Sequence, residues 1–327
     1  MSKLQDNILA VLNDGAIHSG EALGLALGVS RTAVWKQLQK LDAIGLPLES
    51  VKGNGYRLAR GFELLSAADI SAQLKGLHSQ KPRQIEVFHS LDSTNTFVRE
   101  QMATRAYAGS VVFAESQTAG RGRRGKEWLS PYGASIYMSV LWDFEQGAQS
   151  LEGLSLGVGV AVRRAILELG LADVMLKWPN DIYMGGKKLG GILLEMIGDP
   201  AGQCSVVIGV GINVSMPAGT GQNIDQPWTD LSSESSAPIS RNTLAAGLID
   251  QIFTLLADFE TLGFAAYRDE WQSADVYHGL ECSISTPRES VSGVVLGVDD
   301  GGAVRMRLHD GTIQRFIGGE LSLRLTK

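Results

Sequence analysis

The most constraining feature of the chain is a basic, glycine-rich stretch at residues 120–126. Its seven positions hold three glycines, three arginines and one lysine. Glycine permits sharp turns and close backbone approach, and arginine presents a planar fork of donors that matches phosphate or carboxylate. A strand-like apolar run at residues 110–114 leads into the stretch. We therefore expect a flexible cationic loop that closes over an anion.

Two nucleotide-binding patterns also match this stretch. Gly120, Gly122 and Gly125 fit G-x-G-x-x-G. That fingerprint needs a helix that starts inside it, whereas Pro131 and a second strand-like run follow here. The P-loop pattern G-x-x-x-x-G-K continues with Ser or Thr, and Glu127 stands at that position. We reject both patterns, which leaves an anion-binding loop or a solvated basic surface loop.

The N-terminal 62 residues differ in charge from the rest of the chain. They hold seven Lys and Arg against five Asp and Glu, whereas the whole chain has a net charge of −6. Helical patterns at residues 22–27 and 31–41 flank a short turn at Gly28, and a hairpin pattern follows at residues 48–58. This order predicts a winged helix-turn-helix domain over residues 1–62.

The basic balance of this domain favours DNA binding over a purely structural role. A recognition helix contacts bases through residues near its N-terminus. Those residues here are Ser30, Arg31, Thr32, Trp35 and Lys36. On the wing, Lys52 and Arg57 would contact phosphates, which position the protein without specifying sequence.

The remaining residues predict two further domains in an α+β protein. Strand and helix patterns alternate over residues 67–273, which predicts a central α/β domain. Short strands separated by turns predict a small β-barrel over residues 275–327. Residues 216–240 are rich in Pro, Ser, Gly and Asn and predict a long surface loop.

No segment predicts membrane insertion or export. The N-terminus has no apolar signal segment. The most apolar helical run, residues 151–169, carries Glu152, Arg163, Arg164 and Glu168. The two cysteines, Cys204 and Cys282, provide neither a disulfide framework nor metal-ligand spacing. These observations predict a cytoplasmic protein.

Two further stretches combine polar side chains with predicted element ends. Ser93, Thr94 and Asn95 precede a helix predicted from about residue 96, either as caps or as partners of a polar ligand head. Lys188 follows a glycine turn and precedes Gly190 and Gly191, which allow a ligand to approach closely. The alternative for Lys188 is a hairpin lysine in bulk water.

In their order and spacing, these stretches resemble the bifunctional biotin–protein ligases, the repressor-type enzymes of bacteria. The resemblance covers nearly the whole chain. It implies that the central α/β domain is a catalytic domain with a mixed sheet and that the C-terminal β-barrel is SH3-like. Its carriers are residues 93–95, 115–125, 177–181, 188–192, 209–213 and 318–324, together with the winged helix. Gly190 stands where many members of the family have alanine, a change between two small residues.

The resemblance implies two half reactions and a regulatory role. Biotin and ATP, with Mg²⁺, would give biotinyl-5′-AMP, which then biotinylates one lysine of the biotin carboxyl carrier protein of acetyl-CoA carboxylase. The adenylate-bound homodimer would bind operator DNA and repress biotin synthesis genes. Two alternatives stay open. A lipoate or octanoate ligase shares the catalytic core but has no need of a winged helix, and a biotin-sensing repressor would lack turnover.

The resemblance also implies roles for individual residues. The implied biotin-binding residues are Ser93, Thr94, Asn95, Gln117, Gly120, Arg121, Gly122, Arg123, Lys188 and Gly191. The implied nucleotide-binding residues are Arg123, Arg124, Trp128, Asn180, Asn213 and Arg324. The implied catalytic residues are Arg121, Arg123, Lys188 and Asp181, and Asp181 would hold magnesium or orient the incoming lysine. No covalent nucleophile is implied, so catalysis would consist of positioning and electrostatics.

Overall fold

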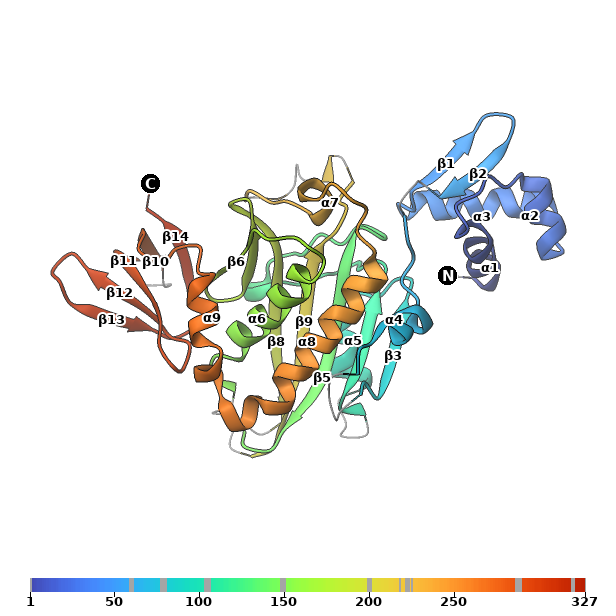
Figure 1. Ribbon diagram of the computed structural model, residues 1–327. Coiled ribbons are helices and arrows are strands. Elements are labelled where there is room, and N and C mark those ends of the chain that lie inside the picture. The colour runs from blue at the N-terminus through green and yellow to red at the C-terminus, as the bar shows by residue number, and fades with distance from the viewer. Residues whose placement is uncertain are drawn as a thin grey trace.

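The structure is a computed structural model that describes residues 2–58, 62–76, 81–102, 107–147, 151–198, 202–217, 219–220, 224, 226–285, 290–318 and 321–326. The winged helix and the C-terminal sheet lie at opposite ends of a larger central part (Figure 1). This arrangement confirms the predicted α+β class. The residue limits of the three domains stay predictions.

The N-terminal part is a winged helix-turn-helix. Its elements are α1 (Lys3–Leu12), α2 (Gly20–Leu27), α3 (Arg31–Ala43), β1 (Leu48–Val51) and β2 (Gly55–Leu58). The Ser19 and Ser30 hydroxyls cap α2 and α3 by accepting from Ala22 N and Ala33 N. Gly28 ends α2 at φ 67°, a left-handed conformation that favours glycine. These local signals fix the angle at which α3 is presented.

The central part is built on a seven-stranded mixed sheet with the order β3-β4-β5-β9-β8-β7-β6. The strands are β3 (Gln84–Phe88), β4 (Ser110–Ala114), β5 (Ser135–Phe144), β6 (Val174–Lys177), β7 (Asp181–Met184), β8 (Lys187–Gly198) and β9 (Cys204–Asn213). Only the β3–β4 pair is parallel among the described strands. Strand β9 lies in the middle of the sheet between β5 and β8, and most of its residues are buried.

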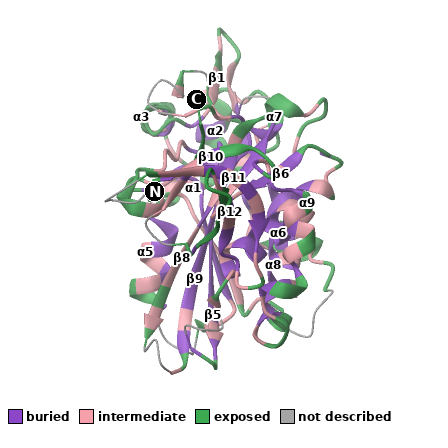
Figure 2. Ribbon diagram, turned by 90° about the vertical axis from the view of Figure 1, so that its left-hand side faces the viewer, coloured by how far each residue is buried: buried purple, intermediate pink, exposed green. Residues whose placement is uncertain are grey.

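Helices cover the two faces of this sheet unequally. The helices are α4 (Ala67–Gln73), α5 (Thr94–Gln101), α6 (Leu154–Leu167), α7 (Leu231–Glu234), α8 (Arg241–Leu262) and α9 (Arg268–Ser273), with short 3₁₀ turns at Arg123–Gly125 and Phe264–Ala266. The long helices α6 and α8 bury one face, and α5 is the one helix of the described ranges that packs on the other (Figure 2). The part of this face that α5 does not cover is therefore available to form a cavity.

Two sequence predictions are corrected here. The helix predicted from residue 96 begins at Thr94, because Ser93 acts as its N-cap. The predicted last residue of this helix, Ala103, lies outside the described residues. The predicted surface loop at 216–240 contains α7, and Thr229 and Asp230 beside it are buried. Proline and serine content indicated irregular chain but carried no signal for this packing.

The C-terminal part is a five-stranded antiparallel sheet with the order β13-β12-β11-β10-β14. Its strands are β10 (Glu281–Ser285), β11 (Ser290–Val298), β12 (Val304–Leu308), β13 (Ile313–Phe316) and β14 (Ser322–Leu325). The chain just before β10 adds to the edge of the central sheet, where Leu176 N donates to Ala274 O at 2.7 Å. The buried Trp178 indole donates to Gly302 O at 3.0 Å. The SH3-like barrel form stays a prediction.

A buried ion pair clamps the segment that follows the winged helix. The Arg241 guanidinium, at the start of α8, donates to Glu115 Oε2 at 2.7 Å and to Glu63 O at 2.8 Å. Both side chains of the pair are at most 4% exposed. Glu115 Oε1 also accepts from Leu65 N at 2.6 Å. The segment is therefore held against the end of β4.

A second contact joins the winged helix to the central part. Tyr132 is buried in the hydrophobic cluster that holds the winged helix together. Its hydroxyl lies 2.6 Å from His89 Nδ1, and His89 Nε2 lies 3.1 Å from an Asp6 carboxylate oxygen of α1. Burial lowers the pKa of His89, which favours the neutral form of its ring.

Arg241→Met tests the clamp, because it leaves the Glu115 carboxylate buried without its cation. Loss of one partner from a buried pair costs about 3–5 kcal/mol. We expect a correspondingly lower denaturant midpoint for the full chain. Arg268→Met is the matched control, since Arg268 pairs with Asp269 and Asp300 at the surface. Equal midpoints for the two variants would contradict the clamp.

Candidate active site

A cavity of about 650 Å³ opens on the face of the central sheet that carries α5. Fifteen of the sixteen predicted ligand-binding or catalytic residues line it: Ser93, Thr94, Asn95, Gln117, Arg121, Gly122, Arg123, Arg124, Trp128, Asn180, Asp181, Lys188, Gly191, Asn213 and Arg324. These residues come from segments more than 200 positions apart in the chain. The fold therefore brings together what the sequence only suggested as separate stretches.

Gly120 is the exception among the predicted binding residues. A Cβ atom at Gly120 would lie 2.4 Å from Trp128 O and 2.6 Å from Ser130 Oγ. The backbone of Trp128 also donates to Gly120 O at 2.9 Å. Gly120 thus allows the two ends of the basic loop to pack closely and lies behind the cavity wall.

Two glycines of β9 form the floor of the cavity. A Cβ atom at Gly209 would lie 2.3 Å from Asn95 Oδ1, and one at Gly211 would lie 2.9 Å from Trp128 Cε2. Real side-chain carbons do not approach this closely, so glycine is required for Asn95 and Trp128 to lie against the sheet. Gly190 of β8 is similarly tight, with Gly211 O only 2.5 Å from the Cβ position.

The first turn of α5 supplies a neutral polar end. Ser93 Oγ accepts from Thr96 N, and Thr94 donates to Gln117 Oε1 from its backbone N at 2.9 Å. Gln117 in turn donates to Ser130 Oγ at 3.0 Å. Ser93, Thr94 and Asn95 are all buried. The capping and ligand interpretations of this triplet are therefore compatible, because Ser93 caps α5 and lines the cavity.

The basic loop supplies cationic groups to the same cavity. Arg123 donates to Asn180 Oδ1 at 3.0 Å, and burial lowers the pKa of its guanidinium, with Arg124 acting in the same direction and Asp181 opposing both. The lowered value still leaves Arg123 charged near neutral pH. Arg124 adopts φ 60°, a left-handed conformation that is uncommon outside glycine.

The loop forms a 3₁₀ turn and then leads through extended chain into β5. A dinucleotide or P-loop site would require an α-helix at this point. Rejection of both patterns is therefore confirmed.

Lys188 lies inside the cavity wall, so the solvated-lysine interpretation is wrong. Its Nζ is 2.7 Å from Asp181 Oδ1, and each side chain is 15% exposed. The same Nζ lies 5.5 Å from the centre of the Trp128 ring. Lys188 and Asp181 neutralise each other here, and an entering anion would compete with Asp181 for the lysine.

Sequence reasoning missed a cationic group beside this pair. Lys177 Nζ lies 5.1 Å from the Tyr183 ring centre and 5.4 Å from the Tyr277 ring centre. It also donates to the Tyr183 hydroxyl at 3.0 Å. Burial raises the pKa of Tyr183 to about 12, so the phenol stays protonated. Lys177 belongs to a stretch already singled out, whereas no sequence signal indicated Tyr277.

The segment around Trp228 was also missed. Lys188 N donates to Pro227 O at 3.0 Å, and Thr229 N donates to Lys188 O at 2.9 Å. This short parallel bridge carries Trp228 and its neighbours over the cavity. Asn213, at the end of β9, holds the same segment by donating to Thr229 O at 3.0 Å. The predicted surface loop is thus partly a cavity wall.

Magnesium fits this site only together with a phosphate ligand. The described residues contain no group of three or more His, Cys, Asp or Glu side chains that could hold a metal ion. Asp181 offers one carboxylate within the cavity. Mg²⁺ is commonly held by one or two carboxylates plus substrate phosphates and water, and a single Asp181 matches that pattern.

The predicted DNA-contacting residues lie far from this cavity, on the winged helix. Ser30, Arg31, Thr32, Trp35 and Lys36 are exposed at the N-terminal half of α3, and Lys52 is exposed on the wing. Arg57 instead donates to Glu49 Oε2 at 2.6 Å across the hairpin. Its charge is therefore partly neutralised before any phosphate arrives.

No helix within the described ranges has both the length and the apolar character needed to cross a membrane. The motif at 318–324 is only partly described, because Gly319 and Glu320 lie outside the described residues. Its Leu321, Ser322, Leu323 and Arg324 line the cavity.

Comparisons with known proteins agree with this geometry. The sequence matches the profile of the Biotin/lipoate A/B protein ligase family over residues 87–213 and that of an HTH domain over residues 5–57. The Bifunctional ligase/repressor BirA of Escherichia coli (strain K12) is 38% identical over 317 residues, which cover 97% of this chain and 96% of that protein. The protein of the same name from Bacillus subtilis (strain 168) is 33% identical and covers 93% of each chain.

Solved structures show the same relation. The biotin protein ligase from Aquifex aeolicus in complex with biotin and ATP has a TM-score of 0.65 with this chain at 26% identity. The match covers 75% of this chain and 100% of that chain.

Gly209→Ala tests the cavity floor. The added Cβ would collide with the Asn95 amide, so Asn95 or β9 must move, and we expect a loss of about 1–3 kcal/mol in the free energy of unfolding. Gly159→Ala in α6 is the control, since its Cβ would meet Leu176 at an ordinary 3.5 Å. Helix propensity should make that change neutral or stabilising. Denaturant unfolding of both variants measures the difference, and an unchanged Gly209→Ala midpoint would contradict the packing argument.

Proposed function

The chain belongs to the family of bifunctional biotin ligases and repressors, and on that premise we propose a reaction and a regulatory role. It activates biotin with ATP to biotinyl-5′-AMP and transfers biotin to one lysine of a biotin carboxyl carrier protein. The adenylate-bound dimer represses biotin synthesis genes. The observation that carries this proposal is one cavity with a neutral polar end and a cationic end.

The two ends suit the two parts of biotin. Ser93, Thr94 and Gln117 offer neutral donors and acceptors, which suit a ureido ring. Arg121, Arg123 and Lys188 offer positive charge, which suits the carboxylate and the phosphates of ATP. A volume of about 650 Å³ lies within the usual range of ligand pockets. Trp128 would pack beside the adenine.

In the first step the biotin carboxylate attacks the α-phosphate of ATP, and pyrophosphate leaves. The two reacting groups are both anions and repel each other. Arg123 and Lys188 lower that repulsion in a partly dry cavity, where charge interactions are stronger than in water. Lys188 exchanges its Asp181 contact for the ligand. Mg²⁺ held by Asp181 and the phosphates would supply further neutralisation.

In the second step the carrier lysine attacks the acyl carbon of the adenylate. The new amide bond forms as the bond to the phosphate oxygen breaks, and AMP leaves. Asp181, released from Lys188, orients the incoming amine. The basic loop, held to Asn180 by Arg123, shields the mixed anhydride from water until the carrier arrives.

The repressor role depends on a dimer. Within the described residues, β7 pairs only with Lys187 to Gly191 of β8, so the second half of β8 is bonded on its β9 side alone. Met196 in that half is exposed. Such an edge can pair with its copy in a second chain, and two winged helices would then contact two operator half-sites.

Ligand and dimer would be coupled through the basic loop. Ordering of residues 120–126 by the adenylate can complete a dimer surface nearby. The coupling is reciprocal, so dimerisation strengthens adenylate binding by the same factor. Carrier protein would compete with the second protomer, and unmodified carrier would lower repression.

The test of the reaction is a ligation assay with biotin, ATP and an acceptor domain of carrier protein. Mass spectrometry should show one biotin added per acceptor, dependent on ATP. Lipoate is included as a competitor, and its preferential addition would overturn the proposal in favour of a lipoate ligase. Biotin binding without any transfer would indicate a sensing repressor instead.

Lys188→Ala should lower biotin binding and adenylation together by about 10- to 100-fold, because a charge-assisted hydrogen bond contributes about 1.5–3 kcal/mol. Lys187→Ala is the matched control, since Lys187 is exposed on the same strand. Arg123→Gly should keep adenylation measurable but release biotinyl-AMP faster, as followed by its escape rate. Undiminished adenylate retention in Arg123→Gly would contradict the shielding role.

Arg31→Ala should weaken operator binding about tenfold or more while ligation is unchanged, because one good base contact contributes about 1–3 kcal/mol. Lys40→Ala, near the other end of α3, is the control. Gel-shift and sedimentation titrations with and without biotinyl-AMP measure both binding and dimerisation. Equal operator affinity in the two ligand states would rule out the switch.

A further inference from the structure

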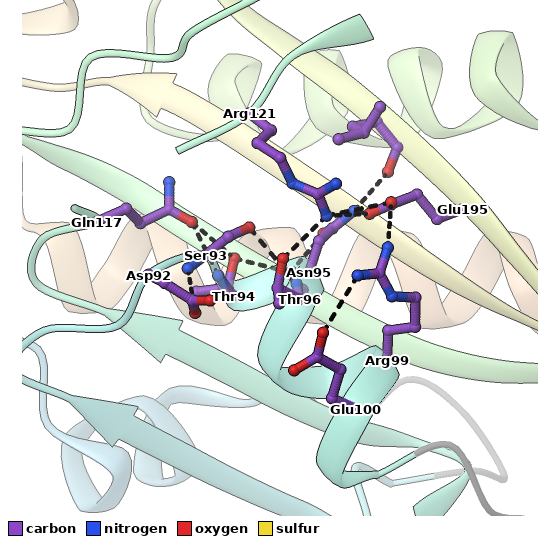
Figure 3. A network of polar contacts seen from close by, with 12 residues as sticks. Asp92, Ser93, Thr94, Asn95, Thr96, Arg99, Glu100, Gln117, Arg121 and Glu195 are labelled. Atoms are coloured by element: carbon purple, nitrogen blue, oxygen red, sulfur yellow. Dashed lines mark hydrogen bonds and ion pairs between the residues drawn. The ribbon is translucent and has the colours of Figure 1, made fainter. Parts of the chain in front are cut away.

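Glu195 of β8 contacts two cavity-lining residues without lining the cavity itself (Figure 3). Its carboxylate accepts from Asn95 Nδ2 at 2.8 Å and from Arg121 Nη2 at 3.2 Å. Asn95 lies on α5, and Arg121 lies on the basic loop. One carboxylate therefore ties the basic loop to the polar end of the cavity.

The contact with Arg121 holds the beginning of the basic loop in place. The Arg121 guanidinium also donates to Thr96 Oγ1 at 2.9 Å. The two acceptors lie on different elements, Thr96 on α5 and Glu195 on β8, so the planar guanidinium is held between helix and sheet. Arg99 donates to the same carboxylate at 3.1 Å. Glu195 thus carries the charge that balances two arginines.

The contact with Asn95 sets the direction of a hydrogen-bond chain. An ionised carboxylate can only accept, so the Asn95 amide nitrogen must face Glu195 and its oxygen must face the other way. That oxygen lies 2.6 Å from Ser139 Oγ, whose hydroxyl must then donate to it.

Ser139 Oγ also lies 2.8 Å from Thr94 Oγ1. The Thr94 hydroxyl donates to Gln117 Oε1 at 3.2 Å, and Thr94 N donates to the same oxygen at 2.9 Å. Glu195 therefore helps to set the orientation of the Asn95 amide from outside the cavity, with Leu193 O as a weaker second acceptor for Asn95 at 3.3 Å.

We propose that Glu195 is a positioning residue for biotin, acting through Arg121 and Asn95. It holds Arg121 at the cavity rim and fixes the donor and the acceptor of the hydrogen bond between Ser139 and Asn95. The inference rests on the proposed function, since it names a residue that shapes the biotin side of the same site. The cavity-lining residues that Glu195 contacts above are Asn95, on the biotin side, and Arg121, which also faces the phosphates of ATP.

Glu195→Gln tests this role, because it removes the charge and keeps the shape. We expect the KM for biotin to rise about tenfold, since a charge-assisted hydrogen bond is weakened and the amide can present a donor to Asn95. The KM for ATP should rise less than the KM for biotin, because Asn95 contributes to the biotin side alone. Glu100→Gln is the matched control, since Glu100 contacts only the outer side of Arg99 in this network.

Two further variants separate positioning from simple structural support. Ser139→Ala removes the donor to the Asn95 oxygen and should raise the biotin KM in the same direction without altering Glu195. In an Arg121→Ala background, Glu195→Gln should have a much smaller effect on biotin affinity than in the wild type, because part of its route is gone. Thermal unfolding of each variant reports any loss of folded protein.

Several outcomes would overturn the inference. A wild-type biotin KM in both Glu195→Gln and Ser139→Ala would overturn it, as would an equal rise in the KM values for biotin and ATP. Fully additive effects of Glu195→Gln and Arg121→Ala would remove the route through the basic loop. If the wild type itself adds no biotin to the acceptor, the proposed function fails first, so the two failures are distinguishable.

Discussion

The buried pair of Arg241 and Glu115 is the contact on which the arrangement of the molecule depends. It joins the segment after the winged helix, the end of β4 and the start of α8 at one point inside the protein. An ionised pair is tolerated there because Glu115 Oε1 and the two terminal nitrogens of Arg241 also bond to backbone groups. Gln117 follows Glu115 by two residues, so the same contact that places the DNA-binding part also anchors one wall of the cavity.

The cavity is shaped by glycines, which have no side chain, on one strand and by larger side chains that lie against them. Glycines at 209 and 211 leave the middle of β9 bare, and Asn95 and Trp128 fill the space. The opposite face of the same strand is packed with aliphatic residues under α6 and α8. A sheet packed on one face by helices thus carries on its other face polar groups within hydrogen-bonding distance of one another, which is the condition for electrostatic catalysis.

Much of the site was predictable because its signals are local. The arginines and glycines at 120–126, the Ser93 triplet and Lys188 after its turn each pair a residue type with a local backbone conformation, and all but Gly120 and Gly125 line the cavity. The missed residues lack such signals. Tyr277, Trp228 and Glu195 sit in stretches that are typical of ordinary structure, and they gain their roles only from neighbours distant in sequence.

By itself, the sequence determined the element types, the α+β class and the chemical groups available to the site, because periodicity, caps and charge act over a few residues. Only the tertiary structure decided how charges are paired. Lys188 is neutralised by Asp181, Arg57 by Glu49 and Arg121 by Glu195, each across strands or between loop and sheet. The reason is physical: electrostatic energy depends on distance and burial, and both are set by packing between segments that the chain itself keeps far apart.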